Sequence, residues 1–245
     1  MPRYKLTLEY DGGPFCGWQR QSNGPSVQEA LELAARKLTS SDVQAIGAGR
    51  TDTGVHATGQ VAHLDLDRVW PLDTLRSALN FHLRPQPLVV LLVEPAGLDF
   101  HARFSARVRH YSYRIVTRAA PLALDAGRAW FVPGRLDPEL MHEATRSLIG
   151  RHDFTSFRGA GCQAASPVKT LDHLAVRTNS HELIVTARAR SYLYHQIRNL
   201  VGTLKLVGEG KWPVEAVEHA LRARDRAAAG PTAPAHGLYL TRVDY

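Results

Sequence analysis

The first predicted element of secondary structure is the segment RYKLTLEY, residues Arg3 to Tyr10. Apolar and polar side chains alternate along this segment, which is typical of a strand with one buried face. The face expected to be buried carries Tyr4, Leu6, Leu8 and Tyr10. The sequence Asp11-Gly12-Gly13-Pro14 then ends the strand with turn-forming residues.

The remainder of the first half continues the pattern with two helices and three strands. Ser26 and Glu29 form the signature of a capping box, and apolar residues follow at helical spacing as far as Leu38. Further elements are predicted as strands at 43–48, 60–67 and 88–93 and a helix at 72–83. The first half therefore has the order β-α-β-β-α-β.

The second half repeats this order with one added helix. A strand is predicted at 107–117, with Tyr111, Tyr113 and Ile115 on one face. Asp137-Pro138 starts a helix that Gly150 is expected to end. The remaining elements are predicted as strands at 171–178, 183–192 and 238–243 and helices at 195–207 and 214–222. The Ala-, Gly- and Pro-rich stretch 227–235 is expected to be an ordered or semi-ordered loop.

Both halves match the split β-α-β arrangement. We therefore expect an α+β protein of two ferredoxin-like halves, residues 1–106 and 107–245, with antiparallel sheets and helices packed on the sheet. The halves join near residues 104–108.

Composition excludes several classes of protein. The 245 residues are 44% hydrophobic and 22% charged, which is ordinary for a globular protein. No apolar run approaches the roughly 20 residues that span a bilayer, and the N-terminus has no signal-peptide pattern. With only Cys16 and Cys162, a disulfide scaffold and a thiolate zinc finger are excluded, and a cytoplasmic location is expected. The phosphate loop GxxxxGK[ST], HExxH and GxSxG are absent, and the 12 histidines have no metal-ligand spacing.

The charge balance leaves nucleic-acid binding open. Lys and Arg number 30 against 23 acidic residues, and only five of the 30 are lysines, which leaves 25 arginines. The guanidinium group suits phosphate and can stack on bases. A high genomic content of Arg and Ala codons would explain the same bias.

The Gly-rich segment GAGRTDTGVHATG, residues 47–59, joins two predicted strands and is longer than a tight hairpin needs. Its one carboxylate, Asp52, follows the guanidinium of Arg50 by two residues. A neighbouring Arg favours the ionised form of a carboxylate, which suits a nucleophile more than a general acid. The alternative is that Asp52 only makes an Asx-turn.

Two further segments have a functional and a purely structural interpretation. RFSARVRHYSYR, residues 103–114, interleaves basic and aromatic residues, as a surface that pairs phosphates and stacks a base would; Tyr111 and Tyr113 could instead lie in the core. Arg198 lies just after the predicted start of a helix, where the helix dipole disfavours a cation. A carboxylate could hold it there, or it could be a solvated arginine.

Several segments stand in order along the chain: FCGWQRQ at 15–21, GRTDTGVHA at 49–57, DFHARF through YSY at 99–113, Ser156-Phe157 through Gly161-Cys162, and APAHGLYL at 233–240. Together they resemble the tRNA pseudouridine synthase A family, whose catalytic motif is usually GRTDAGVHA. Thr53 replaces the usual Ala, and Tyr192 and Gln196 replace the commoner Phe and Met before Arg198.

The resemblance implies isomerisation of uridine to pseudouridine at positions 38, 39 and 40 of the tRNA anticodon stem-loop. It implies no cofactor or metal, a homodimer, and an RNA-binding cleft between the halves. Asp52 would be the catalytic aspartate, and Tyr111 would stack on the target uracil and help to move its C5 proton. Arg50 would help to extrude the base or hold its backbone, and Arg198 would pair with Asp52.

Two other functions stay open at this point. A pseudouridine synthase acting on another RNA would use the same carboxylate, and a non-catalytic RNA-binding module would need none. A glycosidase would normally place two carboxylates about the scissile bond, whereas this loop offers one.

Overall fold

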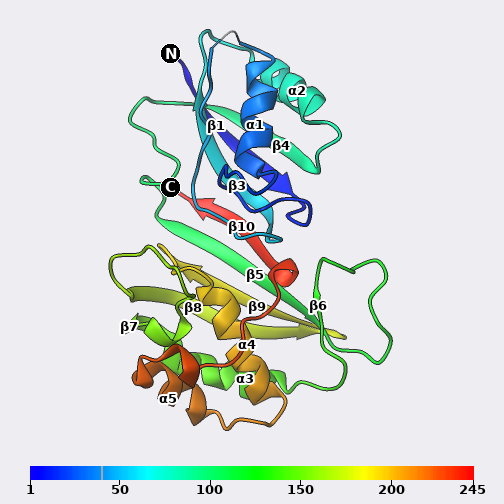
Figure 1. The fold of residues 1–245 in the computed structure, drawn as a ribbon, viewed down its shortest axis with the longest axis vertical. Coiled ribbons are helices and arrows are strands. Elements are labelled where there is room, and N and C mark those ends of the chain that lie inside the picture. Colours follow the sequence, from blue (N-terminus) through cyan, green and yellow to red (C-terminus); the bar gives the residue numbers. More distant parts are fainter. Residues whose placement is uncertain (40) are drawn as a thin grey trace. The chain divides into compact units, whose positions relative to one another are not determined.

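The computed structural model describes residues 1–39 and 41–245 and has an α+β architecture (Figure 1). The chain forms two compact units. The first unit consists of Met1–Arg107 with Tyr239–Tyr245, and the second of Val108–Leu238. The expected half 107–245 is therefore corrected at its C-terminal end, because the last strand returns to the first unit.

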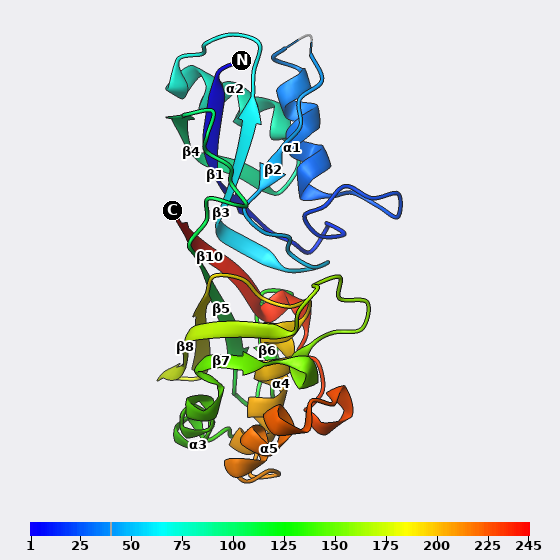
Figure 2. The same cartoon turned by 90° about the vertical axis from the view of Figure 1, so that its left-hand side faces the viewer.

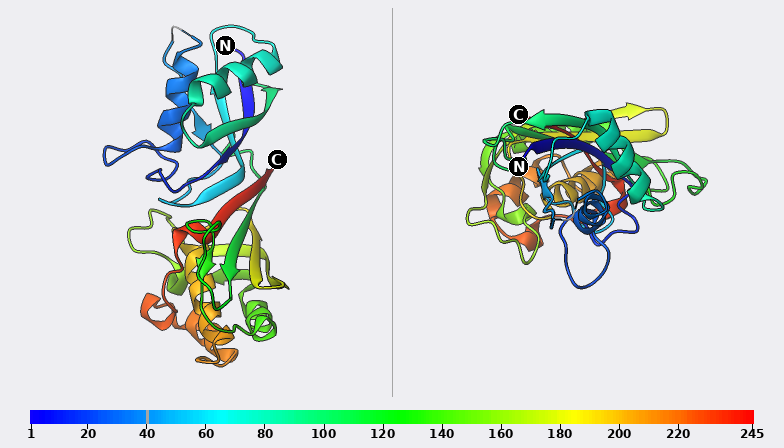
Figure 3. Two further views of the ribbon diagram at one scale, coloured as in Figure 1. Left: turned by 90° about the vertical axis from the view of Figure 1, so that its right-hand side faces the viewer. Right: turned by 90° about the horizontal axis from the view of Figure 1, so that it is seen from above.

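The first unit has the element order predicted for it. Its sheet runs β4-β1-β3-β10, with β2 also paired to β3. The elements are β1 (Arg3–Tyr10), α1 (Val27–Arg36), β2 (Ile46–Gly47), β3 (His56–Asp65), α2 (Leu72–Leu83), β4 (Leu88–Ala96) and β10 (Leu238–Asp244). The two helices lie side by side on one face of the sheet (Figure 3).

The strand β1 and the helix α2 have the predicted bounds, and α1 begins as predicted but ends at Arg36, two residues before Leu38. The four apolar residues expected on the buried face of β1 are at most 3% exposed. Ser26 is the N-cap of α1, and its hydroxyl accepts the Glu29 N–H at 3.2 Å.

Three strands of the first unit differ from their predicted bounds by more than one residue, and one of them, β4, extends three residues beyond the predicted 88–93. The strand expected at 43–48 is reduced to β2, because the backbone of Ala45 bonds to side chains of α1: its N–H donates to Glu32 and its carbonyl accepts from Gln28. The strand β3 begins four residues before the predicted residue 60, because His56 and Ala57 pair in parallel with β10.

The second unit is an antiparallel sheet of order β5-β9-β8-β7, with the short β6 added in parallel to β5. The helices α3, α4 and α5 pack together on one face of it (Figure 2). The elements are β5 (Val108–Val116), β6 (Trp130–Phe131), α3 (Pro138–Ala144), β7 (Gly150–Asp153), β8 (Val168–Asn179), β9 (Glu182–Ala189), α4 (Gln196–Gly208) and α5 (Glu215–Ala223).

The predicted helix from Pro138 to Gly150 is wrong in its second half. α3 ends at Ala144 and a 3-10 turn follows, while Gly150, at φ +109°, opens the strand β7. The short strands β6 and β7 were not predicted. No helix in the described part of the chain is long and apolar enough to cross a membrane.

Candidate active site

The loop that carries Arg50 and Asp52 connects β2 to β3 in the first unit. Thr51 is buried, at 6% exposure, while Arg50 is exposed and Asp52 is half-buried. Thr51 is therefore a buried residue between two functional candidates that are more exposed to solvent. The turn after Asp52 is closed by its own backbone carbonyl, which accepts the Val55 N–H at 3.1 Å.

Hydrogen bonds on both sides of Arg50 hold this loop to the neighbouring backbone and core. The hydroxyls of Tyr10 and Thr51 are 2.8 Å apart, in a buried hydrogen bond. The backbone N–H of Trp18 donates to the Thr51 carbonyl at 3.0 Å, and Gln60 Nε2 donates to the Gly49 carbonyl at 2.9 Å. The positions before and after Arg50 are thus both fixed.

The FCGW segment at residues 15–18 folds against the loop at contact distance. Gly17 has φ +92°, and a Cβ there would lie 2.6 Å from the Thr51 carbonyl oxygen. A Cβ at Gly12 would lie 2.0 Å from the Val55 carbonyl oxygen. Only glycine allows these approaches, so the FCGW segment, through Gly17, and the preceding turn, through Gly12, both support the Asp52 loop.

The residue that follows the loop, His56, is also fixed. It is 2% exposed, its Nδ1 accepts the Gly12 N–H at 3.0 Å, and its ring stacks on Tyr239 at 4.7 Å between centroids. β1, β3 and β10 therefore all contribute to the frame of the loop.

Tyr111 lies on β5 in the second unit and is half-buried. Its ring meets Tyr192 edge to face, with centroids 5.2 Å apart and planes at 85°. Tyr192 donates its hydroxyl to the Arg109 carbonyl, and burial raises the pKa of Tyr192 well above its usual range. The Tyr111 ring is thus supported by a neutral, fixed aromatic neighbour.

Tyr113, two residues further along the same face, has the core role that the sequence left open. It is fully buried, its hydroxyl donates to the Pro234 carbonyl at 2.7 Å, and burial raises its pKa far above the usual range. Of the two tyrosines, Tyr111 alone keeps part of its ring at the surface.

Arg198 lies in the first turn of α4 and is half-buried. Its Nε donates to the Ala233 carbonyl at 2.8 Å, and its own carbonyl accepts the Ala233 N–H at 3.1 Å. Gly202 permits this contact, since a Cβ there would overlap the Pro231 carbonyl oxygen at 1.7 Å. The segment before β10 thus orients Arg198, whereas its pairing with Asp52 stays a prediction.

The four predicted site residues thus divide between the units. Arg50 and Asp52 share one loop of the first unit, and Tyr111 and Arg198 belong to the second. The supporting roles of Tyr10 and Gln60 were not predicted from the sequence. Each of the two residues carries a polar group on a strand face that the sequence predicts to be buried. A polar group in such a place requires a hydrogen-bond partner, and this feature could have identified both residues.

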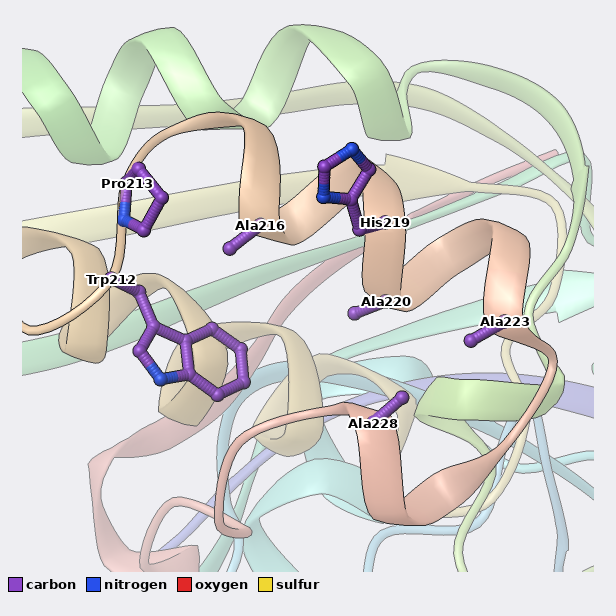
Figure 4. A pocket seen from close by; sticks show the side chains of 7 residues that line it. All are labelled: Trp212, Pro213, Ala216, His219, Ala220, Ala223 and Ala228. Carbon is purple, nitrogen blue, oxygen red and sulfur yellow. The ribbon is translucent and has the colours of Figure 1, made fainter.

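Two other features are separate from these residues. A cavity of ≈ 380 Å³ in the second unit is lined by Trp212, His219 and small residues of α5 and its surroundings (Figure 4). It has no carboxylate in its lining. Across residues 1–39 and 41–245, no three His, Cys, Asp or Glu residues are grouped so that they could hold a metal ion.

Comparison with known proteins assigns the family. The sequence profile described as tRNA pseudouridine synthase matches residues 7–105 and 144–245. The chain belongs to the tRNA pseudouridine synthase family. Three relatives named tRNA pseudouridine synthase A align with all 245 residues: 60% identity in Rhodospirillum centenum, 59% in Paramagnetospirillum magneticum and 55% in Parvibaculum lavamentivorans. The alignments cover 100%, 96% and 100% of those proteins.

The first matched region lies within the first unit, whereas the second spans part of the second unit and the strand β10, which belongs mostly to the first unit. The first region, residues 7–105, contains the Asp52 loop and the FCGW segment that supports it. The second, residues 144–245, contains Arg198 and the segment that orients it. Tyr111 lies outside both matched regions of the family profile, within the full-length alignments to the relatives.

Proposed function

We propose that this protein isomerises uridine to pseudouridine in tRNA, at positions 38, 39 and 40 of the anticodon stem-loop, with Asp52 as the catalytic residue. The observation that carries the proposal is the full-length identity of 60% with a protein named tRNA pseudouridine synthase A. The half-buried Asp52, on a loop fixed at both sides of Arg50, supports the assignment of the carboxylate.

The reaction breaks the bond from N1 of the uracil to C1′ of the ribose and forms a bond from C5 to C1′. The C5 proton leaves, and N1 gains one, so that atoms balance without a cofactor. One ionised carboxylate serves each of three routes: attack on C1′, addition to the ring, or assistance to a glycal. We assign this task to Asp52, while Arg198 pairs with its negative charge.

Retaining the detached uracil requires a pocket that excludes water. Tyr111 supplies a partly exposed ring on a rigid strand, supported by Tyr192, and its role is to stack on the uracil and help to move the C5 proton. Arg50 is exposed beside Asp52, and its role is to extrude the base or hold the backbone of the flipped nucleotide. Extrusion costs a few kcal/mol of unstacking, which arginine–phosphate contacts offset.

We also propose that the protein acts as a homodimer in the cytoplasm. The strand β4 ends the sheet of the first unit and exposes large apolar side chains, with Val89, Leu91 and Leu92 each at least 40% exposed. Phe81 of α2 is 67% exposed. Exposed apolar edge strands favour pairing with another chain. Leu91→Lys combined with Leu92→Lys should yield monomers by light scattering; an unchanged mass would refute this interface.

The experiment that tests the proposed function is site mapping of pseudouridine on unmodified tRNA treated with the purified protein. We expect new pseudouridine at positions 38–40 and none in ribosomal RNA treated in parallel. Modification of ribosomal RNA alone would replace the tRNA assignment with another RNA substrate. Binding of tRNA without any modification would reduce the protein to an RNA-binding module.

A further inference from the structure

A buried polar group lies directly under the Asp52 loop and has no part in the chemistry proposed above. Tyr10 is the last residue of β1 and is 3% exposed. Its hydroxyl makes a hydrogen bond of 2.8 Å with Thr51 Oγ1. Within the triplet Arg50-Thr51-Asp52, only Thr51 is buried. Burying a tyrosine hydroxyl in a core is unfavourable unless it has a partner, so this contact selects one position of the loop.

The same hydroxyl is connected to a second support. Gln60 is fully buried on β3, its Nε2 lies 3.5 Å from the Tyr10 hydroxyl, and the same nitrogen donates to the Gly49 carbonyl at 2.9 Å. The Gln60 Oε1 accepts the Val61 N–H at 3.1 Å, which fixes the amide orientation. Gly49, Gln60, Tyr10 and Thr51 therefore form one chain of contacts that ends immediately before Asp52.

We infer that Tyr10 and Gln60 are positioning residues for catalysis: through Thr51 and Gly49 they set where the Asp52 carboxylate stands relative to the reacting ribose. The inference rests on the proposed function of Asp52. Neither residue touches the substrate in this account. Small displacements of a reacting group lower the rate steeply, because near-attack geometry is lost.

The role of Tyr10 is distinct from proton transfer. Burial raises the pKa of Tyr10 to about 12, so the hydroxyl stays protonated at the pH values at which such enzymes are assayed. A positioning residue should lower the rate by the same factor at every pH. A proton donor should instead remove one limb of the pH–rate profile.

The strand β1 offers a matched control for the loss of a tyrosine hydroxyl. Tyr4 lies on the same face of β1, is 2% exposed, and its hydroxyl accepts the Trp70 N–H at 2.7 Å. Trp70 lies just before α2, in a segment that does not include the Asp52 loop. Tyr4→Phe and Tyr10→Phe thus each remove one buried hydroxyl, and only the second reaches Thr51.

The test is single-turnover kinetics on unmodified tRNA with Tyr10→Phe, Tyr4→Phe and Thr51→Val. We expect Tyr10→Phe and Thr51→Val each to slow the chemical step by roughly tenfold to a hundredfold, with tRNA affinity within about twofold of wild type. The double variant should be no slower than the slower single variant, because both remove the same contact. Thr51→Ser keeps a hydroxyl and should retain most of the wild-type rate.

Three results would overturn the inference while wild-type activity is present: equal rates in Tyr10→Phe and Tyr4→Phe, additive losses in the double variant, or a loss confined to one limb of the pH profile. If Tyr10→Phe fails to fold, the comparison of Thr51→Val with Thr51→Ser decides. Absence of activity in the wild-type protein would instead refute the proposed function on which the inference rests.

Discussion

Replacing Gly17 by alanine should damage the Asp52 loop without touching any side chain of the site. The residue has φ +92°, a conformation that costs about 1 kcal/mol or more for a residue with a Cβ. The new methyl group would also lie 2.6 Å from the Thr51 carbonyl oxygen, which is backbone and cannot rotate away. Relieving such overpacking costs typically 1–3 kcal/mol.

These two effects together predict a loss of about 3 kcal/mol in the free energy of unfolding. In a protein of this size that lowers the melting temperature by roughly 6–12 °C. The new Cβ would also lie 3.2 Å from the Asp52 carbonyl carbon, so we expect the relief to displace the loop and to shift the Asp52 carboxylate with it. A displacement near 1 Å corresponds to a rate loss of about a hundredfold, which single-turnover assays well below the melting temperature would measure.

A matched control separates backbone strain from displacement of the loop. Gly210 has φ +68°, and a Cβ there would have no atom within 4 Å. Gly210→Ala should therefore lose about 1 kcal/mol of stability from strain alone and keep the wild-type rate. Equal activity in Gly17→Ala and the wild type would refute the claim that the FCGW segment supports the loop.

The other predictions concern pH, salt and stacking. Burial, followed by the nearby Arg3 and His101, lowers the pKa of His63 from 6.5 to about 4 while its Nδ1 accepts the Ala102 N–H. His63 therefore binds a proton more tightly in the unfolded chain than in the folded protein. Its contribution to the free energy of unfolding is fully present above pH 6.5 and is lost as the pH falls toward 4. Denaturant titrations should show a loss of about 2 kcal/mol over that range, after screening, that His63→Gln lacks; an identical pH dependence in both would contradict it. Raising salt from 50 to 200 mM should weaken tRNA binding by roughly a thousandfold or more in filter-binding assays, and a flat response would exclude a phosphate-dominated interface. Tyr111→Phe should keep its stacking ring and lose less activity than Tyr111→Leu, and the reverse order would contradict a mainly stacking role.

The periodic elements could be predicted because their cause is local. The alternation of apolar and polar residues predicted both ends of β1 correctly. The helical spacing of apolar residues after the Ser26 cap predicted the start of α1. β2 could not be bounded this way, since Glu32 and Gln28 on α1 compete for the Ala45 backbone. The return of β10 to the first unit depends on pairing with His56 and Ala57, which are distant in sequence and leave no local signal.

The site shows the same division between local and distant causes. The Asp52 loop stood out by its glycines and its single carboxylate, and Arg50 by its spacing from it. The hydrogen bond between Tyr10 and Thr51 spans 41 positions, and the one from Gln60 to Gly49 joins a strand to a loop. Alternation placed Tyr10 in the core but could not name the partner of its hydroxyl.

Replacement of one oxygen of a single side chain probes the proposed chemistry most directly. Asp52→Asn keeps the size of the side chain and removes its charge, and release of tritium from [5-³H]uridine-labelled tRNA reports turnover at C5. We predict that turnover falls below detection while tRNA affinity, measured on the same preparation, stays within about threefold of wild type. Turnover at the wild-type rate in the Asn variant would contradict the assignment of the nucleophile or base to this carboxylate.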